Sequence, residues 1–132
     1  LKHFKDTLTA NQFPKAPAAS CTLKTVHPSM TESLSPAMYI IPRIDDMQTN
    51  QIYLNLTDSG ASNELMPTLA HEGYPGHMYQ TTYYYNTNPN PIRTIYENDG
   101  YVEGWATYVE GLSYDYCGLN SNVAEFTRLF NL

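Results

Sequence analysis

The sequence is poor in cysteine, in basic residues and in long apolar runs, and each shortage excludes a class of protein. Two cysteines in 132 residues cannot build the disulfide framework of small secreted domains. Seven Lys and Arg, scattered singly among thirteen Asp and Glu, give a formal net charge of -6 and argue against a nucleic-acid partner. No run approaches the ~18 uninterrupted apolar residues of a membrane span. We therefore expect a globular domain without a transmembrane segment.

The length and the ends of the chain bear on its completeness. With 132 residues, 42% of them hydrophobic, residues 1–132 can bury one core and are expected to form a single domain. The chain opens on Leu1 without an initiator Met and stops at Leu132 within an apolar-periodic run. We therefore expect a fragment of a longer protein, and surface exposed by truncation would favour a homo-oligomer. Cys21 and Cys117 can form a disulfide or stand as small buried residues, and both alternatives stay open.

The hydrophobic pattern divides the chain into a small β region over residues 1–57 and a helical region over residues 58–132. Alternating or β-branched runs predict strands over 21–26, 37–41 and 51–56, after a short helix within 1–13. Asp58-Ser59-Gly60 is a turn signal, beyond which helical spacing predicts helices over 64–72, 76–85, 99–118 and from 121 onward. The pattern therefore predicts an α+β fold, a small antiparallel sheet followed by three or more helices.

The most informative residues are His71, Glu72 and His77, which resemble a stretched zinc-peptidase helix motif. In the regular motif two His four residues apart lie on one helix face and share a zinc ion, while the Glu acts on the bound water. Here the two His are six residues apart. Six residues of a regular helix rotate by ~600°, which leaves His77 ~240° from His71 and on the wrong side for shared ligation.

The residues between the two histidines are those that interrupt a helix. Gly73, Pro75 and Gly76 stand between His71 and His77. Pro75 cannot donate to the carbonyl of His71 and clashes with it, at a cost of ~3 kcal/mol or more, while glycines accept unusual dihedral angles. Such a local misfit is expected chiefly where function requires it. We therefore predict a kink or bulge that brings His77 back beside His71.

A catalytic zinc site with three protein ligands needs one more donor and leaves the fourth position to water. Glu103 is the first candidate, on a predicted helix where Glu110 shares its face. We predict Glu103 as the third metal ligand and Glu110 as an acceptor that orients a histidine ring. Cys117 is a spare soft donor, but fourteen residues of helix place it ~21 Å from Glu103, too far to share one ion.

Two segments also resemble a known family. HEGYPGHMYQ over residues 71–80 and EGWATYVE over residues 103–110 resemble the two signatures of the bacterial domain-of-unknown-function family 885, roughly H-E-x-x-P-G-H-x-x-Q and E-G-W-A-x-Y-x-E. The resemblance implies a gluzincin-like zinc metallopeptidase with a zincin-like catalytic core. By motif position it implies His71, His77 and Glu103 as metal ligands and Glu72 as general base. Family members are several times longer, so the resemblance implies a catalytic-core fragment.

The resulting hypothesis is a zinc-dependent peptidase with one zinc ion per chain and a peptide as its substrate. Glu72 would take a proton from a metal-activated water and deliver it to the leaving amine. The strand over residues 51–56, if it lies at a sheet edge, could hold an extended peptide by main-chain hydrogen bonds. Two alternatives come from other classes: a non-catalytic zinc-peptidase-like binding domain, and a structural metal site, which is normally closed by four protein ligands.

Overall fold

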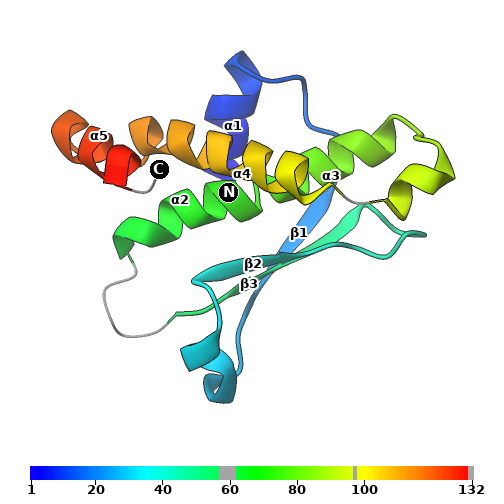
Figure 1. Cartoon of the computed structure of the whole chain (residues 1–132), viewed down its shortest axis with the longest axis horizontal. Coiled ribbons are helices and arrows are strands. Elements are labelled where there is room, and N and C mark those ends of the chain that lie inside the picture. Colours follow the sequence, from blue (N-terminus) through cyan, green and yellow to red (C-terminus); the bar gives the residue numbers. More distant parts are fainter. Residues whose placement is uncertain (57–61, 97, 131–132) are drawn as a thin grey trace.

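A computed structural model of the chain describes residues 1–56, 62–96 and 98–130 (Figure 1). The element order confirms the α+β class, with a three-stranded sheet in the first half and helices in the second. The strands are β1 (Ser20–Thr25), β2 (Ala37–Ile40) and β3 (Thr49–Leu54), and the helices are α1 (Lys2–Asn11), α2 (Ser62–Glu72), α3 (His77–Asn86), α4 (Asp99–Ser113) and α5 (Ser121–Phe130). Short 3-10 turns lie at Pro28–Ser33, Pro91–Thr94 and Tyr114–Tyr116. The predicted turn at Asp58-Ser59-Gly60 lies outside the described residues.

The sheet is mixed, which corrects the prediction of an antiparallel one. The strand order is β1-β3-β2, with β1 parallel to β3 and β2 antiparallel to β3. The predicted strand positions are close to those observed, but the third strand enters between the first two. The physical reason is burial: Asn50 and Ile52 of β3 are fully buried, whereas β1 is largely exposed, so β3 takes the position with neighbours on both sides.

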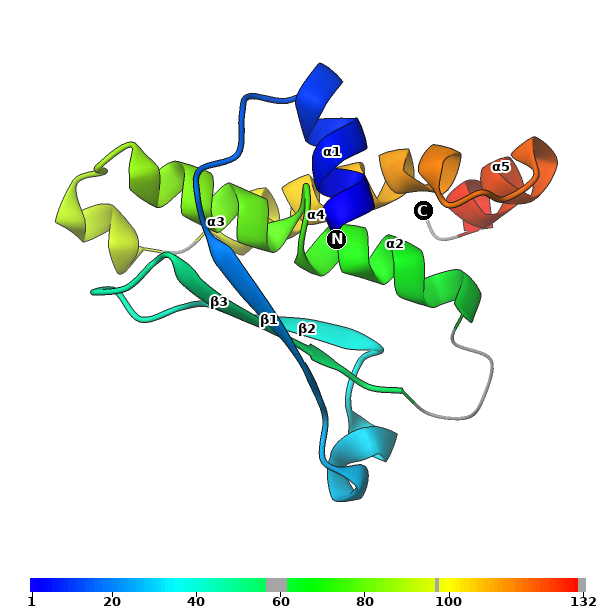
Figure 2. The same cartoon turned by 180° about the vertical axis from the view of Figure 1, so that it is seen from behind.

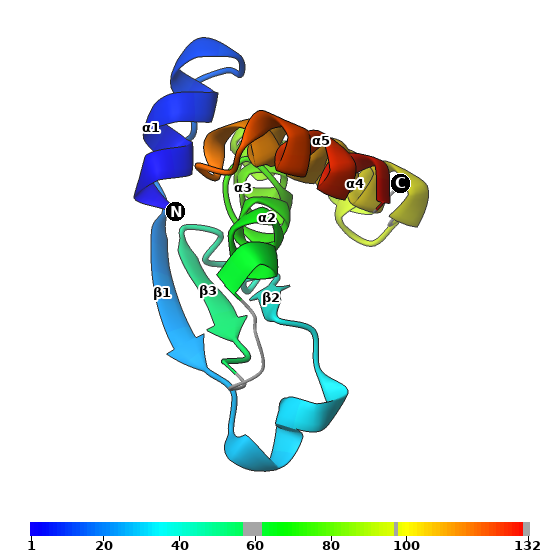
Figure 3. The same ribbon diagram turned by 90° about the vertical axis from the view of Figure 1, so that its left-hand side faces the viewer.

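The helices gather on one face of the sheet. Figures 1 and 2 show α2 and α3 following one another across this face, with α4 running alongside them. Seen along these helices, α2 and α3 lie between the sheet and α4 (Figure 3). Contacts of α2 with β2 and with α4, and of α3 with α4, hold the layers together. The helical layer is therefore where distant segments of the chain meet.

The hydrophobic core fills the space between the sheet and the helices. Its buried residues come from α1, β2, β3, α2, α3 and the segment between the last two: Phe4, Ala37, Ile52, Leu69, Ala70, Tyr74, Met78 and Tyr79. Cys21 and Cys117 are both free in this structure, and each is partly buried and packs against this core. Among the described residues no helix has the length and apolar character needed to cross a bilayer.

Candidate metal centre

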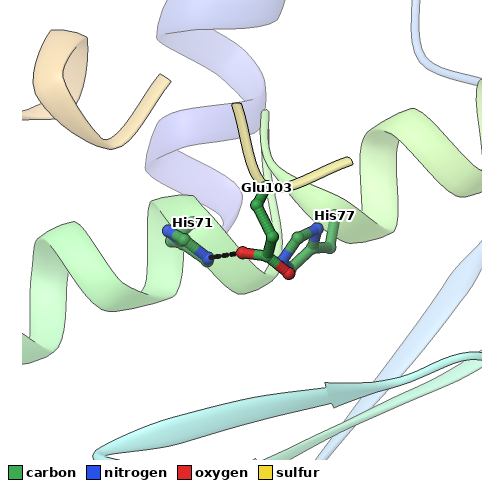
Figure 4. A group of neighbouring side chains, drawn as sticks. All are labelled: His71, His77 and Glu103. Carbon is green, nitrogen blue, oxygen red and sulfur yellow. Dashed lines mark ion pairs between the residues drawn. The ribbon is translucent and has the colours of Figure 1, made fainter. Parts of the chain in front are cut away.

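Three helices bring His71, His77 and Glu103 to one point. His71 is the penultimate residue of α2, His77 opens α3 and Glu103 lies in the first half of α4. One ligand atom from each residue lies within 4.8 Å of the others, and Figure 4 shows the carboxylate of Glu103 between the two imidazole rings. Glu103 Oε2 lies 3.4 Å from His71 Nε2, and Glu103 Oε1 lies 3.5 Å from His77 Nε2. The structure thus places the three predicted ligands together.

The segment between α2 and α3 brings the second histidine back beside the first. The helix stops at Glu72 and restarts at His77, so the interruption predicted from the Gly and Pro residues is present. Gly76 N–H donates to the carbonyl of Ala70 at 2.9 Å, and a Cβ at Gly76 would lie 1.7 Å from the carbonyl oxygen of His71. Only glycine fits this close approach. The two imidazole rings then meet edge to face, with centroids 4.8 Å apart.

Helix α4 presents two carboxylates to the same histidine. Glu103 and Glu110 are seven residues apart and therefore lie two turns apart on one side of the helix. Ala106, fully buried, lies between them on that side, and its small side chain lets α2 pack closely against α4. Glu110 Oε2 lies 2.8 Å from His71 Nδ1, while Glu103 faces the other ring nitrogen. Both ring nitrogens of His71 are thus engaged by one helix.

The hydrogen bond to Glu110 orients the ring of His71. An ionised carboxylate only accepts hydrogen bonds, so Nδ1 carries a proton and donates it to Glu110, while Nε2 faces Glu103. The Glu103 side chain is 61% exposed, against 19% for His71 and 13% for His77, so the cluster opens to solvent on the carboxylate side. Two imidazoles and one carboxylate, open on one side, form a donor set that could hold a metal ion.

Burial and neighbouring charges shift the pKa values of His71 and His77 in opposite directions. Burial by itself lowers the pKa of His71, but the hydrogen bond to Glu110 and the charges of Glu72, Glu110 and Glu103 outweigh it, and the pKa of His71 is raised. At His77 burial and the nearby charge of His71 dominate, so the pKa of His77 lies below its ordinary value. His77 is therefore readily available as a neutral donor at neutral pH.

Glu72 stands beside the cluster and is held by the sheet. Its Oε2 accepts a hydrogen bond of 2.7 Å from the backbone N–H of Tyr39, in strand β2. Burial raises the pKa of Glu72 above its ordinary value, and the bond from Tyr39 partly opposes that shift. Glu72 therefore takes up a proton more readily than an ordinary glutamate, and it does so next to His71.

Sequence reasoning missed two contacts that shape the site. One is the Tyr39 N–H just described, for which a sequence carries no signal because every residue except proline has such a group. The other is the indole of Trp105, which donates from Nε1 to the carbonyl of Pro75 at 2.8 Å. A tryptophan two residues after a candidate ligand was the one available signal.

The chain matches, over residues 1–131, the family described as bacterial protein of unknown function (DUF885). Its fold is similar to the crystal structure described as "the putative lipoprotein from Colwellia psychrerythraea", with a TM-score of 0.74 and 25% sequence identity. That similarity covers 95% of this chain and 22% of the other, so this chain spans less than a quarter of that protein's length. Among curated proteins none matches the chain significantly.

Proposed function

The chain belongs to the DUF885 family of bacterial proteins of unknown function, and we propose from its site that it is the catalytic core of a zinc-dependent peptidase. The observation that carries the proposal is the convergence of His71, His77 and Glu103, with ligand atoms within 4.8 Å of one another. The cluster combines the donor types that zinc prefers with an exposed side where water and substrate can enter. One zinc ion per chain is the expected cofactor.

The residues around the cluster fit this metal. Glu110 accepts from Nδ1 of His71, the arrangement by which proteins orient a histidine that binds a metal through its other nitrogen. A bound zinc ion would act as a Lewis acid and would lower the pKa of a bound water molecule toward ~7. His71, His77 and Glu103 would hold the ion, and Glu110 would keep the ring of His71 in place.

Glu72 is the residue to which we assign the proton transfers. Its carboxylate follows His71 directly in α2, and the Tyr39 N–H fixes one of its two oxygens. The other oxygen is then free to take a proton from the attacking water and to deliver it to the amine that leaves when the peptide bond breaks. The raised pKa of Glu72 makes its carboxylate a stronger base toward the water, and it keeps more of the carboxyl protonated near neutral pH for transfer to the amine.

The strand beside the site differs from the one predicted to hold the substrate. The segment over residues 51–56 contains β3, which has β1 on one side and β2 on the other and so has no free edge. Strands β1 and β2 are the two edge strands, and the Tyr39 N–H of β2 points away from β3 toward α2. We therefore assign to β2 the main-chain docking of an extended peptide.

The structural-metal alternative predicts a closed site with four protein ligands. Among the described residues, the cluster of His, Cys, Asp and Glu has three members. Cys117, the spare soft donor, gives its S–H to the carbonyl of Ser113 instead. The geometry thus favours an open site, and the non-catalytic binding domain becomes an outcome of the experiment below.

The test combines metal content with peptide hydrolysis. Plasma emission spectroscopy should find about one zinc per chain in the unsubstituted protein and a sharp fall in the His77→Ala and Glu103→Ala variants. Glu72→Gln should keep its zinc and lose hydrolysis of a mixed peptide library read by mass spectrometry. Hydrolysis retained in Glu72→Gln would contradict the assignment of the base. Zinc bound without hydrolysis by the unsubstituted chain would favour the non-catalytic binding domain.

A further inference from the structure

Trp105 connects the helix that carries Glu103 to the segment that separates the two histidines. Its indole N–H donates to the carbonyl of Pro75 at 2.8 Å. Its ring also packs edge to face on Phe13, with centroids 5.5 Å apart, and stacks on Tyr79 at 6.3 Å. The ring contacts on their own would describe an ordinary core residue. The hydrogen bond is a separate and directional contact.

The acceptor of that bond lies where the site is most sensitive to displacement. Pro75 is fully buried, and it is followed by Gly76, which has no room for a Cβ against the end of α2, and then by His77. A shift of the Pro75 carbonyl therefore moves His77 relative to His71. Binding sites lose function when their groups depart by more than about 0.5 Å from the productive geometry.

We propose that Trp105 is a positioning residue: its hydrogen bond to Pro75 sets the placement of His77 against Glu103 and His71, and so sets the affinity of the cluster for metal. This inference rests on the proposed function, since it names a residue that serves the same metal centre. Trp105 touches no reacting group and acts only through the segment between α2 and α3. Its test must therefore separate the hydrogen bond from the packing of the ring.

The chain allows this separation because Trp105 is its only tryptophan. Growth of a tryptophan auxotroph on 3-benzothienylalanine replaces the indole N–H by sulfur at this one position and keeps the shape of the ring. The mutation Trp105→Phe removes the same N–H by genetic means. The matched control is Tyr79→Phe. It removes a hydrogen bond of 2.7 Å in the same aromatic cluster, whose acceptor, the carbonyl of Pro14, is not in the segment between α2 and α3.

Zinc affinity is measured by competition with a chromophoric chelator, and the cobalt-substituted protein reports ligand geometry through its visible absorption. We expect both Trp105 replacements to bind zinc about 10- to 100-fold more weakly and to alter the cobalt spectrum, as loss of a residue that orients a ligand does. Tyr79→Phe should keep the affinity and the spectrum. Unchanged zinc affinity in the benzothienylalanine protein, or an equal loss in Tyr79→Phe, would overturn the inference and leave the proposed function standing.

A second readout needs no metal. In the metal-free protein the rings of His71 and His77 are close enough, at 4.8 Å between centroids, for a nuclear Overhauser effect between their protons. That signal should weaken in both Trp105 replacements and persist in Tyr79→Phe. If the unsubstituted chain binds no zinc, the proposed function fails, and the ring signal still decides whether Trp105 positions the two histidines. A ring signal equal in all four proteins contradicts the inference.

Discussion

The helical layer and the sheet contribute to the candidate metal centre in different ways. The helices supply side chains: His71 from α2, His77 from α3, and Glu103 with Glu110 from α4. The sheet supplies a backbone group, the N–H of Tyr39, which holds Glu72. The helices therefore carry the candidate metal ligands, while edge strand β2 orients Glu72, the residue that would transfer protons.

The two layers also differ in how closely they are packed and how much of their surface is exposed. The segment between α2 and α3 is so closely packed that Gly76 has no room for a side chain. The sheet instead leaves much of its surface open, with Leu23 of β1 47% exposed and Ile40 of β2 49% exposed. We therefore expect substitutions in the helical layer to have the larger effects.

The largest effect is expected from Gly76→Ala. Because the new Cβ would lie 1.7 Å from the carbonyl oxygen of His71, the segment must move, and His77 moves with it. We expect the free energy of unfolding to fall by roughly 3 kcal/mol or more, and bound zinc to be lost. Urea denaturation and metal analysis measure the two effects.

The matched control for Gly76→Ala is Gly111→Ala, in α4. A Cβ at Gly111 meets nothing within 4 Å, and the residue lies within a helix. Alanine there should stabilise the protein by about 0.5–1 kcal/mol, because glycine loses more backbone entropy on folding. Equal urea midpoints for the two variants would show that the segment before His77 is not confined as described.

A smaller effect is expected from Glu110→Gln. The amide still fits the position but is a weaker acceptor for the Nδ1–H of His71, 2.8 Å away, and it carries no charge. Zinc affinity should fall by about 10-fold or more, while the ligands themselves are intact. Chelator competition measures the change. An affinity equal to that of the unsubstituted protein would mean that Glu110 does not orient the ligand.

The contribution of the sheet is tested at Tyr39 by comparing proline with alanine. Tyr39→Pro removes the N–H that holds Glu72, whereas Tyr39→Ala removes the same ring and keeps the N–H. Proline is tolerated here because β2 is an edge strand and this N–H points away from β3. We expect about a 10-fold lower kcat for proline than for alanine, with equal zinc content, as for the loss of an oriented acid-base group. Equal kcat values for the proline and alanine variants would mean that only the helices contribute to the site.

The smallest effect is expected on stability at alkaline pH, and it involves Tyr79, a core residue between the two layers. Burial raises the pKa of Tyr79 to about 12, above its ordinary value near 10. The stability that its protonated form contributes is complete below pH ~10 and is lost as the pH rises toward ~12, because the unfolded chain ionises first. Between pH 10 and 12 the urea midpoint should fall more steeply in the unsubstituted protein than in Tyr79→Phe. Parallel curves would contradict this assignment.

Prediction from the sequence was most successful where the signal is local. The alternating runs and the Gly and Pro residues located the three strands and the break before His77 to within a few residues. The identity of the three clustered residues also followed from the sequence, since His71, His77 and Glu103 belong to two short motifs. The antiparallel sheet was wrong because the direction of β1 beside β3 depends on pairing between strands far apart in the chain.

The sequence by itself determined which donors are available, that the helix must stop between the two histidines, and which strands and helices can form. These properties follow from residue chemistry and from dihedral preferences over a few neighbouring residues. The sequence also predicted that Glu110 accepts from a histidine ring. Only the tertiary structure decided that this ring belongs to His71, 39 residues away, that Tyr39 holds Glu72 across the layers, and that Trp105 holds the segment before His77. Each of these contacts depends on how β2 and α4 pack against α2 and α3, and packing is fixed by the burial of the whole core rather than by any one segment.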